Sequence, residues 1–92
     1  MNSEDFYIKL KKSLEETTTF PTKYLYKFIV PNQPEKIKQV EDIFNHLGAV
    51  INTKTSSKGT YTSVSIHVKM ESPDQVIEKY KEAAKVEGII SL

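Results

Sequence analysis

The chain of 92 residues contains no cysteine. Disulfide bridges, thiolate metal sites, iron–sulfur clusters and thiol nucleophiles are therefore excluded. A secreted domain of this size often needs disulfides, so their absence fits the reducing cytoplasm, where we expect the protein to reside. The first five residues hold two acids and no apolar run, and they do not predict a signal peptide. No apolar segment approaches the ~20 residues of a transmembrane helix, and we expect no membrane association.

Arginine is also absent, because all thirteen basic residues are lysines, and the net charge is only +1. Arginine offers a planar fork that binds phosphate at two points, whereas lysine offers a single point charge. Acylphosphatase-type chemistry, which needs such an arginine, is excluded. A nucleic-acid binder usually shows a basic excess, so this composition counts against nucleic-acid binding.

Histidine is scarce, with only His46 and His67 in the chain. His67 stands two residues after Ser65 on a predicted strand, and such side chains lie about 7 Å apart, too far for a hydrogen bond. No acid is placed in the sequence to orient the imidazole. His46 falls in the last turn of a predicted helix, where a cation is favoured, and is interpreted as a solvated capping residue. We therefore expect no catalytic site, no metal and no cofactor.

Residues 2–16 predict an amphipathic helix that Asn2 or Ser3 can cap. Phe6, Tyr7, Leu10 and Leu14 share its apolar face. The narrow stripe and the acids on the polar face favour docking on the rest of the protein over binding to a membrane surface or a partner. Three threonines and a proline end the helix. We therefore divide the chain into a helical extension, residues 1–19, and a domain, residues 20–92.

The domain alternates strands and helices in a recognisable order. Strands are predicted over residues 23–30, 49–55, 61–70 and 89–92. One helix starts at Asn32, with Glu35 completing a capping box, and ends at Gly48. The other starts at Ser72 and ends at Gly88. The order βαββαβ predicts an α+β ferredoxin-like sandwich, with an antiparallel four-stranded sheet in the order 4-1-3-2 and both helices on one face.

The strand over residues 61–70 has the clearest alternation in the chain. Val64, Ile66 and Val68 are predicted to face the core, and the residues between them to face water. The hairpin loop over residues 56–59 precedes this strand. The predicted interaction surface joins this loop with the water-facing side of the sheet. Its members are Leu25, Lys27, Ile29, Ser56, Ser57, Lys58, Gly59, Tyr61, Ser63, Ser65 and His67.

Two stretches carry a family likeness. One runs from Phe20, Pro21 and Thr22 into Tyr26 and Lys27; the other is residues 56–66 (SSKGTYTSVSI) together with residues 75–80. Over residues 20–92 the chain resembles the YbeD-like family of small bacterial proteins, a domain of unknown function sometimes labelled lipoate regulatory protein. The resemblance implies an ACT-like ferredoxin fold and a regulatory role. It implies no ligand and no catalytic residue.

Three hypotheses for function follow. The first is a non-enzymatic regulatory or adaptor domain that binds a protein partner, or a second copy of itself, through the predicted interaction surface. The second is an ACT-type sensor of an amino acid or related carboxylate, although the turn from Pro31 to Pro34 lacks the glycine that such domains use. The third is weak single-stranded nucleic-acid binding, for which Tyr61 is the only aromatic residue on the exposed side of its strand. The hairpin loop itself also fits a plain turn.

Overall fold

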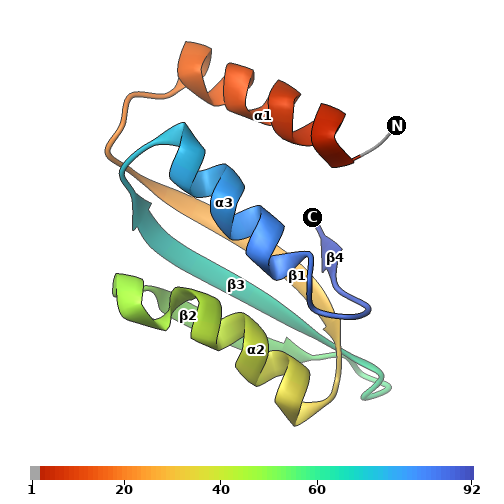
Figure 1. Ribbon diagram of the computed structural model, residues 1–92. Helices are drawn as coiled ribbons and strands as arrows, with labels where there is room; N and C mark the ends of the chain where they lie inside the picture. Colours follow the sequence, from red (N-terminus) through yellow and green to blue (C-terminus); the bar gives the residue numbers. More distant parts are fainter. Residues whose placement is uncertain (1–2) are drawn as a thin grey trace.

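The computed structural model describes residues 3–92 and contains three α-helices, a short 3₁₀ helix and four strands in that range (Figure 1). In chain order the elements are α1 (Ser3–Thr17), β1 (Thr22–Pro31), α2 (Pro34–Phe44), η1 (Asn45–Leu47), β2 (Val50–Thr55), β3 (Tyr61–Met70), α3 (Pro73–Ala83) and β4 (Ile90–Ser91). All the predicted strands and helices are present. The fold is α+β and ferredoxin-like, with α1 placed before the βαββαβ unit.

The sheet is antiparallel throughout and has the strand order β2-β3-β1-β4, which is the predicted order counted from the other edge. The long strands β1 and β3 lie in the centre, with Tyr26 opposite Ile66. The helices cover one face of the sheet (Figure 1). The opposite face carries no helix in the described part of the chain, so the sheet has one covered side and one open side.

The core lies between the sheet and the helices. Val64 and Ile66 are fully buried, as the alternation of β3 predicts. Aromatic side chains fill the layer beneath α3, and the rings of Tyr26 and Tyr80 have centroids 4.8 Å apart. The Tyr26 hydroxyl donates a hydrogen bond of 3.0 Å to the carbonyl oxygen of Val76. This bond satisfies a polar atom that would otherwise be costly to bury.

Helix α1 docks on α3, as its apolar stripe favours. Leu14 is buried, Tyr7 and Leu10 pack against the core, and the Phe6 and Tyr80 rings form a T-shaped contact. An ion pair of 2.7 Å joins the ammonium nitrogen of Lys11 to Asp74 at the start of α3. The cap predicted at Asn2 or at the Ser3 side chain lies outside the part of the chain that the structure describes.

The capping role predicted for Asn32 is wrong. The residue at the N-cap of α2 is Gln33, and no side chain caps this helix. The Asn32 amide instead donates to the Gly59 carbonyl oxygen, and its oxygen accepts a hydrogen bond from the Thr62 hydroxyl, both at 3.0 Å. Pro31 remains in β1, so Asn32 lies beside the hairpin rather than at the start of the helix. The side chain therefore ties the end of β1 to the β2–β3 hairpin.

The predicted start of α3 is confirmed and its predicted end is not. The Ser72 hydroxyl accepts a hydrogen bond from the Gln75 backbone N–H, and the Gln75 side chain accepts one from the backbone N–H of Glu71. The α-helix ends at Ala83, before Gly88. Turns follow, and they bring the buried side chain of Val86 onto the core. Because α3 ends at Ala83 rather than at Gly88, the side chain of Val86 can reach the core.

Candidate functional site

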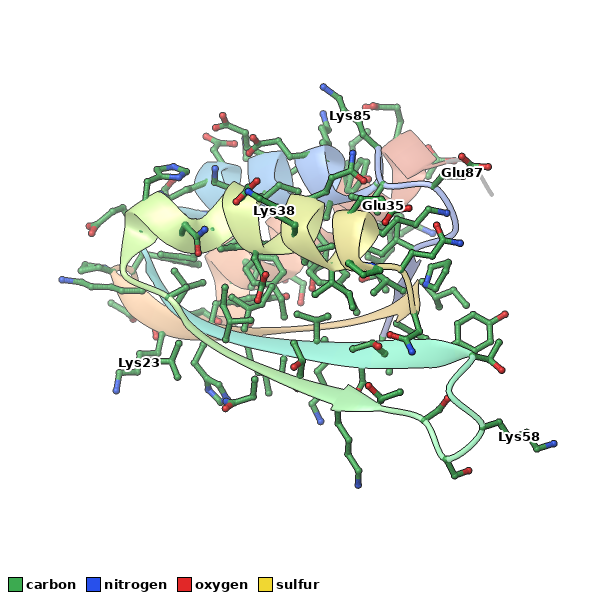
Figure 2. The ribbon with its side chains drawn as sticks, turned by 90° about the horizontal axis from the view of Figure 1, so that it is seen from below. Lys23, Glu35, Lys38, Lys58, Lys85 and Glu87 are labelled. Carbon is green, nitrogen blue, oxygen red and sulfur yellow. The ribbon has the colours of Figure 1, made fainter. Side chains whose placement is uncertain are left out.

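The open face is the side of the sheet that points away from the helices (Figure 2). Strand alternation places on it every second residue of the three long strands, because successive side chains point to opposite sides. From β1 it takes Lys23, Leu25, Lys27 and Ile29, from β2 Val50, Asn52 and Lys54, and from β3 Tyr61, Ser63, Ser65, His67 and Lys69. All the strand residues of the predicted interaction surface lie here.

The register defines which of these side chains are neighbours. His67 stands between Leu25 of β1 and Val50 of β2. Ser65 stands between Lys27 and Asn52. The strands therefore bring no acid beside His67, and both of its cross-strand neighbours are apolar.

The next row joins Ser63 to Ile29 on one side and to Lys54 on the other. Ile90 of the edge strand β4 extends this row, because it pairs with Ile29. The open face thus mixes apolar and cationic positions. Serines occupy its centre line along β3.

The hairpin loop is held by its own hydrogen bonds. Gly59 has a φ of +72°, a left-handed conformation that favours glycine, and its N–H donates to the Ser56 carbonyl oxygen at 2.9 Å. The Ser56 hydroxyl accepts a bond of 3.2 Å from the Tyr61 backbone N–H. Lys58 extends from the tip of the loop (Figure 2). Ser56 and Gly59 are thus explained by the turn, whereas Lys58 is free to contact a ligand.

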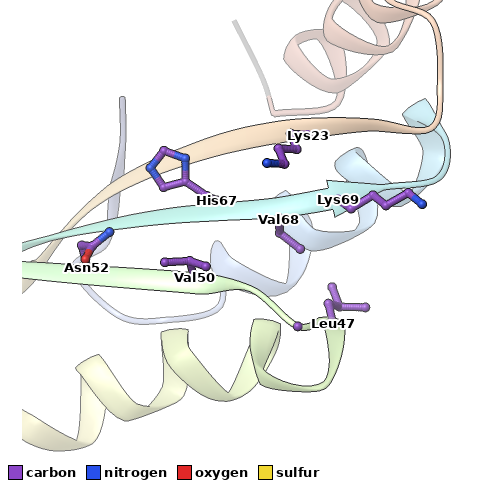
Figure 3. Close-up of a pocket in the computed structure, with 8 residues that line it drawn as sticks. Lys23, Leu47, Val50, Asn52, His67, Val68 and Lys69 are labelled. Carbon is purple, nitrogen blue, oxygen red and sulfur yellow. The ribbon is translucent and has the colours of Figure 1, made fainter.

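Two shallow depressions lie at opposite ends of the open face. The hairpin pocket, about 300 Å³, is formed by Ile29, Lys54, Thr55, Ser56, Ser57, Tyr61 and Ser63. The corner pocket, about 470 Å³, lies near the start of β2 (Figure 3). The strand residues that line it are Lys23, Val50, Asn52, His67, Val68 and Lys69, and Leu47 and Gly48 complete it. The predicted interaction surface includes most residues of the hairpin pocket but only His67 of the corner pocket.

Charge is sharply segregated between the two layers. The four strands and the hairpin loop contain five lysines and no Asp or Glu. These lysines are Lys23, Lys27, Lys54, Lys58 and Lys69. All twelve acids lie in the remaining segments, together with the other eight lysines. The net charge of +1 therefore combines a basic sheet with a helical layer that carries an excess of acids.

The two histidines lie on different elements. His46 is exposed in η1, and His67 is exposed on β3. Among residues 3–92 there is no group of three His, Asp or Glu side chains that could hold a metal ion. Within the same residues, no helix has the length and apolarity needed to cross a bilayer.

Comparison with known proteins gives the chain relatives along most of its length. A family model described as "Protein of unknown function (DUF493)" matches residues 15–92. UPF0250 protein NTHI0035 of Haemophilus influenzae (strain 86-028NP) is 40% identical over 92 residues, covering 97% of this chain and 96% of the relative. UPF0250 protein YbeD of Escherichia coli O1:K1 / APEC is 35% identical over 81 residues, covering 85% and 93%. No solved structure matches. The chain therefore belongs to the DUF493 family, whose relatives include YbeD, as its loop-and-strand motif indicates.

Proposed function

We propose that the protein is a non-catalytic binding module whose open face recognises an acidic segment of a protein partner. The observation that carries this proposal is the segregation of five lysines, without any acid, onto the strands and hairpin. A surface of one charge attracts and orients a partner of the opposite charge. The regulatory role that the family resemblance implies is compatible with such a module.

Apolar side chains on the same face support a protein partner. Leu25 is 42% exposed and Val50 is 61% exposed, although both are large and apolar. Ile90 extends the apolar part toward β4, and Tyr61, 45% exposed, supplies an aromatic side chain at the hairpin end. Interfaces are enriched in such residues at their centres, where they lose water on binding. An acidic segment with interspersed apolar residues fits this combination.

The charge also favours a different partner over a second copy of the chain. Two open faces packed against each other would bring together lysines from both copies, and like charges in close contact oppose association. Neither face would contribute a strand acid to offset them. Self-association through the open face would therefore increase the local excess of positive charge rather than relieve it.

The surroundings of His67 support a non-catalytic role. A general base needs a partner that orients the imidazole and a nucleophile within hydrogen-bond reach. The cross-strand neighbours of His67 are Leu25 and Val50, which offer neither. Ser65 lies two residues away on the same strand, at a spacing of about 7 Å.

An ACT-type sensor has weaker support at the turn after β1. The backbone N–H of Asn32 donates to the Thr60 carbonyl oxygen at 3.0 Å, and that of Gln33 donates to Pro31 at 2.7 Å. Backbone donors that could approach a ligand at this turn are therefore already used within the protein.

The proposal is tested with a fluorescent ten-residue peptide that contains four glutamates and two leucines, measured by fluorescence anisotropy at low salt. We expect Lys27→Glu with Lys54→Glu to weaken binding by about tenfold or more, because both cations are reversed. The control, Lys12→Glu with Lys85→Glu, makes the same change of net charge in the helical layer and should stay within about twofold. An equal loss of peptide affinity in both variants would refute the proposal that the open face is the binding site.

A single-stranded oligonucleotide of ten thymidines separates the nucleic-acid alternative. If it binds more tightly than the peptide and responds to the same strand variant, the face is a nucleic-acid surface.

The contribution of the hairpin loop to peptide binding is tested with two double variants. One combines Lys58→Glu with Tyr61→Ala, and the other combines Leu25→Ser with Ile29→Ser. Loss of peptide binding only in the second pair would place the interface on the bare sheet and leave the loop as a turn.

A further inference from the structure

The corner pocket arises because β2 is shorter than β3. Val50, the first residue of β2, lies opposite His67, while β3 continues to Met70. The end of β3 therefore has no neighbour on its β2 side. Leu47 and Gly48, which lead into β2, also line the space, and Leu47 lies near the start of β2 (Figure 3). Its volume of about 470 Å³ is within the range of small-molecule sites.

Two cationic residues line this pocket, and no acid lies between them. Lys23 of β1 and Lys69 of β3 are direct cross-strand partners. Like charges placed directly opposite each other destabilise a sheet. Within the described residues neither lysine forms an ion pair, and no carboxylate lines the pocket. Glu71, beyond the end of β3, is not among the lining residues.

Donors and apolar groups complete the lining. The Asn52 amide and the His67 ring both offer N–H groups, and both side chains lie on the open face beside the lysines (Figure 3). Val50, Leu47 and Val68 supply apolar surface. A pocket lined by both N–H donors and apolar side chains suits a small molecule with a charged head and a carbon body.

We propose that the corner pocket binds a small organic dianion, a phosphate monoester or a dicarboxylate, with its charges on Lys23 and Lys69 and its carbon body against Val50 and Leu47. Two cations are balanced by a dianion, whereas a monoanion leaves one of them unpaired. The site shares Val50 and the basic strands with the proposed peptide interface, but its test changes Lys23 and Lys69, whereas the peptide test changes Lys27 and Lys54. Either proposal can therefore fail while the other holds.

The test is a titration followed by ¹H–¹⁵N NMR at constant ionic strength. The probes are phenyl phosphate, succinate and, as a monoanion, acetate. We expect a dianion to shift the amide signals around the corner pocket with a dissociation constant of roughly 0.1–1 mM, and acetate to bind at least about tenfold more weakly. The two dianions identify the preferred head group. Equal binding of acetate, or shifts spread evenly over the sheet, would overturn the proposal.

Matched variants place the site. Lys23→Gln with Lys69→Gln should weaken dianion binding by about tenfold or more. Lys54→Gln with Lys58→Gln removes the same charge at the hairpin end and should change it by less than about twofold. Equal losses would show general attraction to a basic sheet and would overturn the site. Amide signals of the first variant that are unchanged away from the corner pocket confirm that its fold remains intact.

The contribution of the apolar lining residues is tested separately. Phenyl phosphate should bind several-fold more tightly than inorganic phosphate, since each methylene-sized group removed from water contributes roughly two- to fourfold in affinity. Val50→Ser should remove most of this difference while leaving the affinity for inorganic phosphate unchanged. If the two phosphates bind equally to the unmodified protein, the carbon body has no place in the pocket and the ligand class is wrong.

Discussion

Asn32 connects two parts of the chain that are distant in sequence. Its side-chain oxygen accepts a hydrogen bond from Thr62, whose side chain is 2% exposed, and its amide donates to the Gly59 carbonyl oxygen. The local sequence, Asn followed by Glu at the third position, predicts a helix cap, because that signal uses only neighbouring residues. The actual partners lie in the hairpin. A long-range strand pairing therefore decides the role of this side chain.

Replacing Asn32 by Ala should lower the free energy of unfolding by about 1–3 kcal/mol, because the buried Thr62 hydroxyl loses its acceptor. Asn32→Asp keeps an acceptor and should cost less. Asn45→Ala removes an exposed amide contact of 3.3 Å to Asp42 and should change stability by less than about 0.5 kcal/mol. Urea unfolding followed by circular dichroism measures all three. An Asn32→Ala protein as stable as the unmodified one would show that the hydrogen bonds of the Asn32 side chain do not contribute to stability.

Sequence reasoning succeeded for residues whose position follows from alternation. It separated the buried Ile66 from the exposed His67 with no knowledge of the fold, because period-two patterns report the face of a strand. The same alternation, applied to residues 50–54, would have placed Val50 and Lys54 on the open face. The segregation of charge was missed because net charge sums over the whole chain. The corner pocket depends on where β2 begins relative to β3, which composition does not reveal.

At the scale of elements, α1 is joined to α3 by two kinds of contact. Apolar packing involves the buried Leu14, and ion pairs on the surface link Lys11 to Asp74 and Lys81 to Glu4. The amphipathic pattern predicted a docked helix. It did not predict the partner helix, because any apolar groove of the right size would satisfy the same stripe. The division into residues 1–19 and 20–92 is a proposal that a comparison of the full chain with residues 20–92 can test.

We expect the apolar contact to hold α1 in place. Leu14→Ala should lower the free energy of unfolding by about 2–4 kcal/mol, because it removes a side chain from the core. Lys11→Ala should produce no measurable change, since exposed ion pairs contribute little and are screened by salt. Chemical unfolding of both variants at low and high salt decides the matter. If Lys11→Ala lowered the free energy of unfolding more than Leu14→Ala, the ion pair rather than the apolar contact would hold α1 in place.

At the scale of the whole molecule, buried tyrosines link folding to pH. Burial raises the pKa of Tyr26 well above its ordinary value. Burial, followed by the hydrogen bond with Tyr24, also raises the pKa of Tyr80. Below the ordinary tyrosine pKa of about 10, both states are protonated and the stability is fully present. Above it, the unfolded chain loses these protons while the native state keeps them, so stability falls as pH rises.

Thermal unfolding between pH 8 and roughly pH 11.5 should therefore show a midpoint that falls above about pH 10. Each of the two tyrosines contributes a slope of up to about 1.4 kcal/mol per pH unit. Tyr80→Phe should have a lower stability at neutral pH, because it loses the bond to Tyr24, but a shallower alkaline decline. Tyrosinate absorbance should show an additional rise at the unfolding transition, when Tyr26 and Tyr80 become exposed. If the midpoint fell equally steeply with pH in the unmodified protein and in Tyr80→Phe, groups other than Tyr80 would cause the alkaline loss of stability.

The separation of charge between the layers gives the protein an electric dipole moment across its shortest dimension, 20 Å. That dimension exceeds the Debye length of about 8 Å at physiological ionic strength. An approaching molecule therefore feels the nearer layer and little of the farther one. From the sheet side the protein behaves as a polycation, and from the helical side as a weak polyanion, whatever its net charge. Because the net charge is small and the dipole moment is not, the electric field of a charged partner would rotate the protein more than it would pull it. The protein would therefore be oriented before the two molecules come into contact.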